Sequence, residues 1–349
     1  MNLSLIKPNK LKENDIIATV SLSWGGPSIL PDRYNIGVKQ LQDAFNVKVI
    51  PMANTLSDND WIYKNPQARA KDLMDAFLNP DIKAIISTIG GDETIRLLPY
   101  IDFDVIKNNP KIFMGYSDTT VNHFMCLHAG LSSFYGPSIM AGFGENCGLH
   151  QFLKNSVQKT LFSNEVIGKI EPSAEGWTNE ILDWGDPKNQ NIKRKLKPSK
   201  WNFLQGTKTV RGHLIGGCME TMEQIKGTIL WPNKKMFENA ILFFETCNSS
   251  VLDSYFEYML RNYCATGIAQ ICSGMIFGRP AGVDDKNGDF ETFDNIIKTV
   301  LSEYGLSDLP VITQMDFGHT DPMFVIPYGA MAEINPENKT FSILDNGVM

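Results

Sequence analysis

Three side chains that can act together in acyl transfer, Ser117, Glu245 and His319, each follow a short apolar run of the kind that forms a buried strand. A hydroxyl, an imidazole and a carboxylate combine as nucleophile, general base and orienting acid in hydrolases that use a serine. Their order along a chain is not diagnostic, because the same arrangement occurs on unrelated folds. Each residue also has a simpler interpretation: a helix cap for the serine, a strand end for the acid and a surface position for the histidine.

Ser117 lies at the junction between an expected strand and an expected helix. The apolar run 112–115 arrives at a turn, and after the serine a helical pattern continues until Gly130. At such a junction the hydroxyl is exposed and lies beside free N–H groups of the first helical turn, which suits a nucleophile that generates an oxyanion. The elbow motif G-x-S-x-G is present only in part, because Thr119 replaces its second glycine.

A second candidate is the glycine pair Gly90-Gly91, which directly follows the apolar run 82–88 in the sequence TIGGDET. Two glycines allow the backbone to approach a ligand closely, and their N–H groups could hold an oxyanion or a phosphate. The pattern is neither G-x-G-x-x-G nor a P-loop. It is one residue from the GGDGT turn of NAD and lipid kinases, so a kinase is an alternative. Against that alternative, Glu93 puts negative charge beside the phosphates, and Glu245 and His319 would have no role.

The sequence pattern predicts that alternating strands and helices position these residues. Strands are expected at 15–23, 47–51 and 82–88, and helices at 31–45 and from Pro66 onward, where proline suits the first helical position. Near-continuous apolar strands alternating with helices are typical of a parallel sheet covered on both faces. In such sheets ligands bind at the carboxyl ends of the strands, where both the serine and the glycine pair fall.

The length of 349 residues favours two domains. We expect an N-terminal α/β domain over 1–165 with the nucleophile, an inter-domain segment and active-site loop over 166–200, and a mixed α/β domain over 201–349 with the acid and the histidine. In the last part Gly216-Gly217 is expected to open a helix, and the closing strands are expected to be antiparallel.

The segment 166–200 is polar and has neither helical nor strand periodicity. Loops of this length in a compact protein are often functional. Trp177 and Trp184 favour that interpretation, because a purely solvated linker has little use for large aromatic side chains. The alternative is that they only dock the segment onto a domain.

Composition limits the partners. A formal net charge of -7 argues against nucleic acid, which would require a basic face. No apolar run approaches the ~20 residues that span a membrane, and the first residues contain no signal-peptide core. The six cysteines include no C-x-x-C pair, which favours buried free thiols in a reducing cytoplasm. The histidines show no H-E-x-x-H or H-x-H spacing, so the sequence gives weak grounds for a metal.

Taken together, these motifs resemble the LD-carboxypeptidase family of serine peptidases. The resemblance rests on Ser117 in GYSDTT, on TIGGDET, on GHLIGG at 212–217, on Glu245 in ILFFET and on His319 in the FGH turn. It extends over nearly the whole chain. Each motif by itself is weak evidence, and the resemblance is specific because all five occur in the same order as in the family.

The resemblance implies a fold, a mechanism and an assembly. The fold would be a flavodoxin-like parallel-sheet domain followed by a mixed α/β domain, with the active site in the cleft between them. Ser117 would be the nucleophile, His319 the general base and Glu245 its orienting acid, with the backbone N–H groups of Gly91 and Asp118 as oxyanion hole. No metal or cofactor is expected, and family members are typically homodimers.

Two branches of this family differ in substrate. One removes D-alanine from the murein tetrapeptide during cell-wall recycling. The other, the microcin C self-immunity type, cleaves an amide in a peptidyl-nucleotide and uses an aromatic inter-domain loop to stack on the base. The loop with Trp177 and Trp184 is similar to the second branch, which makes a small peptidyl or aminoacyl nucleotide the expected substrate. A non-catalytic peptide-binding protein of the same fold is the remaining alternative.

Overall fold

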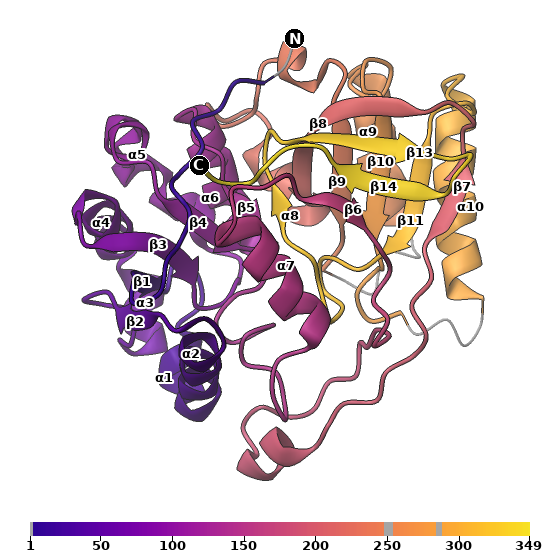
Figure 1. Ribbon diagram of the computed structural model, residues 1–349. Coiled ribbons are helices and arrows are strands. Elements are labelled where there is room, and N and C mark those ends of the chain that lie inside the picture. Colours follow the sequence, from indigo (N-terminus) through magenta and orange to yellow (C-terminus); the bar gives the residue numbers. More distant parts are fainter. Residues whose placement is uncertain (1–2, 248–253, 284–287) are drawn as a thin grey trace.

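The computed structural model describes residues 3–247, 254–283 and 288–349. The chain forms a six-stranded sheet and an eight-stranded sheet, each with its own helices. In Figure 1 strands β1 to β4 and the helices α1 to α6 are indigo to purple, and the second sheet is largely orange to yellow.

The first sheet has the strand order β12-β5-β4-β3-β1-β2. Strands β1 to β5 are parallel, and β12 pairs antiparallel with β5 at the edge. The order 2-1-3-4-5 is that of flavodoxin-like sheets, so the expected fold of the first part is confirmed. The strands are β1 Ile16–Val20, β2 Lys48–Pro51, β3 Ile82–Ser87, β4 Ile112–Gly115, β5 Phe134–Tyr135 and β12 Ile326–Pro327.

Helices cover this sheet, and proline opens two of the longest, at Pro31 and Pro66, as the sequence predicted. The α-helices are α1 Gly26–Ile29, α2 Pro31–Phe45, α3 Asn59–Lys64, α4 Pro66–Leu78, α5 Phe103–Asn108, α6 Thr120–His128 and α7 Gln151–Leu161. Two 3₁₀ turns, η1 Thr94–Tyr100 and η2 Ser117–Thr119, follow β3 and β4.

The second sheet has the order β6-β14-β13-β8-β9-β10-β11-β7. Its centre, β8 to β11, is parallel, whereas the closing strands β13 and β14 are antiparallel, as expected. The strands are β6 Gly168–Ile170, β7 Asn202–Gln205, β8 Val210–Cys218, β9 Ile241–Glu245, β10 Gly274–Gly278, β11 Val311–Met315, β13 Met331–Asn335 and β14 Thr340–Ile343. The helices of this part are α8 Met219–Ile225, α9 Ser254–Ala265, α10 Asp289–Glu303 and the 3₁₀ turns η3 Pro187–Asn191 and η4 Lys234–Phe237.

One local prediction is wrong. Gly216 and Gly217 do not open a helix, because β8 continues through Cys218 and α8 begins at Met219. A Cβ on Gly216 would lie 1.7 Å from the backbone oxygen of Phe243, so the glycine permits β8 and β9 to approach each other. The pair is a packing requirement of the sheet rather than a helix start.

The segment 166–200 runs from β6 into a long loop that turns back on itself (Figure 1). The N–H of Trp177 donates to the backbone oxygen of Lys197, and the N–H of Thr178 donates to that of Asp321, both at 2.7 Å. The first bond closes the loop on itself, and the second holds it against the second part of the chain. The division at 165/166 and 200/201 stays a prediction, since β6 joins the second sheet and β12 the first.

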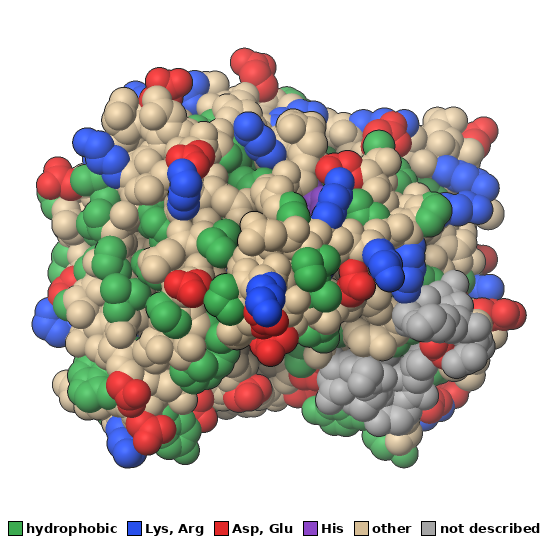
Figure 2. Space-filling view, turned by 90° about the horizontal axis from the view of Figure 1, so that it is seen from below, with side chains coloured by type: hydrophobic (Ala, Val, Ile, Leu, Met, Phe, Trp, Pro, Cys, Tyr) green, Lys and Arg blue, Asp and Glu red, His purple; other side chains and the backbone are tan. Residues whose placement is uncertain are grey.

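Within the described residues, no helix combines the length and the apolar character needed to cross a bilayer. On the face shown in Figure 2, Lys and Arg side chains are scattered among acidic and hydrophobic ones. This face is therefore not a continuous basic surface of the kind that binds nucleic acid.

Candidate active site

Ser117 lies at the end of β4 in a left-handed backbone conformation, with φ of 63°. Such a φ is uncommon for a residue with a side chain, and strained turns of this kind expose the nucleophile in α/β hydrolases. The turn is closely packed: a Cβ on Gly115 would lie 2.3 Å from Ser87 Oγ, and one on Gly90 would lie 2.9 Å from Ser117 Cβ. Glycine at these two positions therefore allows the strained turn to form.

The structure brings the serine, the histidine and the acid together. His319 Nε2 lies 3.0 Å from Ser117 Oγ, and His319 Nδ1 lies 2.6 Å from Glu245 Oε2. The Glu245 side chain is fully buried and the His319 side chain is 19% exposed. A Cβ on Gly318 would lie 2.6 Å from Glu245 Cβ, so the glycine of the FGH turn lets the histidine reach the acid.

A fourth side chain, Tyr135 on β5, completes this arrangement and was not among the sequence candidates. Its buried hydroxyl donates a hydrogen bond to Glu245 Oε1 and accepts one from the backbone N–H of Ser117 at 3.1 Å. Both oxygens of Glu245 are thus engaged, one by the tyrosine and one by the imidazole. No local motif surrounds Tyr135, and only its place at the end of an expected strand could have suggested it.

Electrostatics make the imidazole more basic than usual. Burial lowers the pKa of His319, but the charge and hydrogen bond of Glu245 outweigh burial, with smaller contributions from Cys247 and Glu220. The pKa rises from 6.5 to about 9. Tyr116 packs edge-on against the ring, with centroids 5.0 Å apart, and limits its reorientation. The histidine is therefore held in place as a strong base.

Gly91 and Asp118 lie on the two turns that flank the serine. Gly91 has φ of 144°, and a Cβ there would lie 2.4 Å from Ser23 Oγ. The carboxylate of Asp118 accepts hydrogen bonds from Glu93 N at 3.0 Å and from Thr94 N at 2.9 Å. The Asp118 side chain thus connects the turn that contains Ser117 to the turn that contains Gly90 and Gly91. Burial raises the pKa of its carboxyl group.

Two cavities share part of their lining beside His319. One, of about 420 Å³, includes the Gly90-Gly91 turn, and the other is of about 650 Å³. Both are lined by Tyr116, Trp184 and His319. A ligand whose reacting bond lies at Ser117 can therefore extend along Trp184.

Trp184 has one face occupied. The guanidinium of Arg33 lies 4.4 Å from the centre of its ring, and that arginine also donates to the backbone oxygen of Met140 at 2.8 Å. Burial lowers the pKa of Arg33 to about 10. The tryptophan is thus fixed in orientation against a charged group while it lines the cavity.

Trp177 lies elsewhere. It is 4% exposed, packs 5.6 Å from the ring of Phe290 and lies 4.9 Å from the guanidinium of Arg279. It is absent from the lining of both cavities. The structure therefore separates the two tryptophans that the sequence had grouped together.

The wall beyond Trp184 is held by an ion-pair network. Arg194 Nη2 lies 2.7 Å from Asp321 Oδ2 and also pairs with Glu145. This network joins the segment 166–200 to Asp321, just after His319, and to Glu145. It keeps that side of the larger cavity in place.

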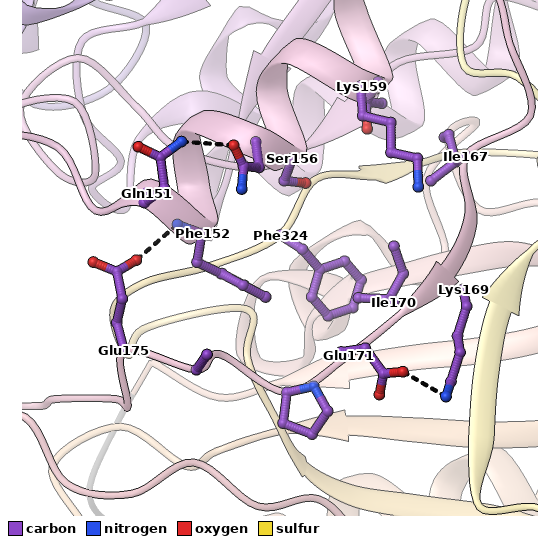
Figure 3. A pocket seen from close by; sticks show the side chains of 14 residues that line it. Gln151, Phe152, Ser156, Lys159, Ile167, Lys169, Ile170, Glu171, Glu175 and Phe324 are labelled. Carbon is purple, nitrogen blue, oxygen red and sulfur yellow. Dashed lines mark hydrogen bonds and ion pairs between the residues drawn. The ribbon is translucent and has the colours of Figure 1, made fainter.

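Another cavity, of about 400 Å³, lies between α7 and β6 (Figure 3). Its charged side chains are partly paired with one another, as in the Lys169–Glu171 ion pair. None of the sequence-predicted site residues lines it. The hydroxyl of Ser156 accepts a hydrogen bond from the backbone N–H of Val325 at 2.9 Å, and we do not consider this cavity the reaction site.

Both parts of the chain are similar to known proteins. The LD-carboxypeptidase N-terminal domain matches residues 17–136, and the LD-carboxypeptidase C-terminal domain matches residues 211–334. The chain is 32% identical over 281 residues to the microcin C7 self-immunity protein MccF of Escherichia coli, covering 79% of this chain and 78% of that protein.

Two solved structures are similar over nearly the whole chain. An MccF-like protein from Streptococcus pneumoniae in complex with AMP has a TM-score of 0.83 and 28% identity, covering 95% of this chain and 98% of that one. MccF in complex with aspartyl sulfamoyl adenosine has a TM-score of 0.85 and 28% identity, covering 99% and 100%. Since models of both domains match, the protein belongs to the LD-carboxypeptidase family of peptidases.

Proposed function

We propose that the protein is a serine amidase that hydrolyses an amide bond in a small peptidyl or aminoacyl nucleotide. The observation that carries this proposal is the chain of hydrogen bonds from Ser117 through His319 to Glu245, beside a cavity lined by Trp184. It is supported by relatives whose structures hold AMP or aspartyl sulfamoyl adenosine.

The mechanism follows from the contacts. The neutral imidazole of His319 accepts the proton from Ser117 Oγ, and the oxygen attacks the amide carbon. Glu245 fixes the tautomer of the neutral imidazole and then stabilises the imidazolium that forms. The histidine then donates the proton to the leaving nitrogen, and a water molecule, activated by the same base, releases the acyl group from the serine.

The oxyanion of the tetrahedral intermediate is assigned to the backbone N–H groups of Gly91 and Asp118. Both residues lie on the turns that flank the serine, and a Cβ on Gly90 would be only 3.3 Å from Asp118 N. Loss of one such donor costs about 3 kcal/mol of transition-state stabilisation. The carboxylate of Asp118 keeps the two turns at a constant distance.

Trp184 is proposed to stack on the nucleobase. Its side chain lines both cavities, and the guanidinium of Arg33 lies over its ring. Stacking a base on an aromatic ring is worth about 1–3 kcal/mol, enough to set a preference among substrates.

We further propose a homodimer in a reducing cytoplasm, without nucleic acid or membrane as partner. All six cysteines are free thiols; four are buried, whereas Cys147 and Cys247 are exposed. Exposed thiols persist most readily where glutathione keeps them reduced. The sequence expectation that the thiols are buried is therefore wrong for these two.

The test is a side-by-side assay of the purified protein on an aminoacyl sulfamoyl adenylate and on a murein L,D-tetrapeptide, with Ser117→Ala as control. Cleavage of the adenylate that depends on Ser117 is the expected result. Cleavage of the tetrapeptide alone would identify a cell-wall recycling enzyme. Cleavage of neither, together with binding of both, would identify a peptide-binding protein, and dependence on Mg²⁺ and ATP would identify a kinase.

A further inference from the structure

Two thiols and a carboxylate meet behind the catalytic acid. Cys218 ends β8, Glu220 lies in the first turn of α8, and Cys247 follows β9 by two residues. Their Sγ and carboxylate oxygen atoms all lie within 4.8 Å of one another. None of the three belongs to the proposed Ser117–His319–Glu245 group, although Cys247 and Glu220 contribute to the raised pKa of His319.

The sheet and its first helix hold this cluster together. In the parallel pair β8–β9, Cys218 is in register with Glu245, which places the thiol next to the residues that follow β9. Glu220 Oε1 accepts a hydrogen bond from the backbone N–H of Cys247 at 3.1 Å, and Cys218 Sγ donates to Glu220 Oε2 at 3.3 Å. Three segments far apart in the chain thus converge on one point.

The three ligands are themselves acidic or thiol groups, and Glu220 is hydrogen-bonded to both cysteine residues. The neighbouring Glu245 is already paired with His319, so the attraction for a cation comes from these three side chains. Glu220 is only partly buried, and water therefore screens this attraction in part.

We propose that Cys218, Glu220 and Cys247 form a binding site for a thiophilic divalent cation of the Zn²⁺ class. Two thiolates and a carboxylate are ligands that zinc prefers, whereas Mg²⁺ and Ca²⁺ prefer oxygen alone. Bond lengths of about 2.0–2.3 Å in a tetrahedron put neighbouring ligand atoms about 3.3–3.8 Å apart. The separation of 3.3 Å between Cys218 Sγ and Glu220 Oε2 already lies in that range.

Cys247 is exposed and lines the larger cavity together with His319. We therefore place the open fourth coordination position on the side of that cavity. A cation held there would take water or a ligand atom as its fourth partner. Binding of the cation does not depend on the proposed reaction. Zinc is expected to inhibit turnover reversibly, because its positive charge lies beside the general base.

The test is a zinc titration of the reduced, metal-free protein against a chromophoric chelator, repeated with Co²⁺ to detect thiolate-to-metal absorption. The wild type is expected to bind one equivalent, and Cys247→Ser and Glu220→Gln are expected to weaken binding by more than about tenfold. Cys147→Ser is the matched control, since Cys147 is the other exposed thiol and its sulfur donates a hydrogen bond to the backbone oxygen of Gln190.

Equal zinc affinity in the wild type and in Cys247→Ser would overturn the proposal. A Co²⁺ complex of the wild type that lacks thiolate-to-metal absorption would also overturn the proposal. This measurement uses the wild type and therefore does not depend on the folding of a variant. Formation of a Cys218–Cys247 disulfide in place of metal binding, detected by mass spectrometry, would also overturn it. Cys247 is exposed, so its serine variant is expected to retain the wild-type unfolding temperature.

Discussion

The hydroxyl of Tyr135 accepts a hydrogen bond from the backbone N–H of Ser117, with an N···O distance of 3.1 Å, and donates one to Glu245 Oε1. This one contact ties the backbone of the proposed nucleophile to the acid that orients its base. The tyrosine comes from the first sheet and the acid from the second. Tyr135 is a positioning residue, since it acts on the reaction through Ser117 and Glu245.

Replacing Tyr135 with Phe is expected to lower kcat about 10- to 100-fold with a smaller change in KM, because a hydrogen bond to a charged group is worth about 1.5–3 kcal/mol. Steady-state kinetics measures both constants. Tyr328→Phe is the matched control, since the Tyr328 hydroxyl is also buried and donates to the Gly216 oxygen at 2.6 Å. Equal losses of kcat in the two variants would show that Tyr135 contributes only to stability.

Ser117→Ala is expected to reduce amide hydrolysis by about 10⁴-fold or more and to leave the unfolding temperature unchanged. The hydroxyl contacts His319 at the cavity, so its removal costs little packing. A fluorophosphonate probe should label the wild type at Ser117 and fail to label the variant. Full activity in Ser117→Ala would exclude the serine mechanism.

The pH dependence follows from the raised pKa of His319. The reaction needs the neutral imidazole, so kcat/KM should rise about tenfold per pH unit below the pKa and level off near pH 9. Glu245→Gln removes the charge that raises this pKa, and the rising limb should move to lower pH. Titration of the imidazole by NMR checks the same shift without turnover. An unchanged histidine pKa in Glu245→Gln would contradict this prediction.

The two tryptophans should differ in effect. Trp184→Ala is expected to weaken a nucleotide substrate about 5- to 150-fold, the equivalent of about 1–3 kcal/mol of stacking, and to spare a murein peptide. Trp177→Ala is expected to lower the free energy of unfolding by about 3–5 kcal/mol, because that ring is buried. Substrate titrations and denaturant unfolding separate the two effects. Equal weakening of both substrates by Trp184→Ala would argue against stacking.

The sequence by itself determined which residues to test. Apolar runs predicted the strands that Ser117, Glu245 and His319 follow, because burial of a strand leaves a periodic trace in its own residues. The alternation of strands and helices predicted the parallel sheet of the first part, and the observed order confirms it. Glycines that permit close approach, such as Gly90, were visible as motif residues.

Only the tertiary structure decided the contacts. The bond between His319 and Ser117 spans 202 positions, and that between Tyr135 and Glu245 spans 110. Local periodicity carries no information on which strand ends meet across two sheets. It also cannot distinguish Trp184, which lines the cavity, from Trp177, which packs inside, because both have the same composition around them. Those differences arise from the way the segment 166–200 folds back on itself and onto the second part of the chain.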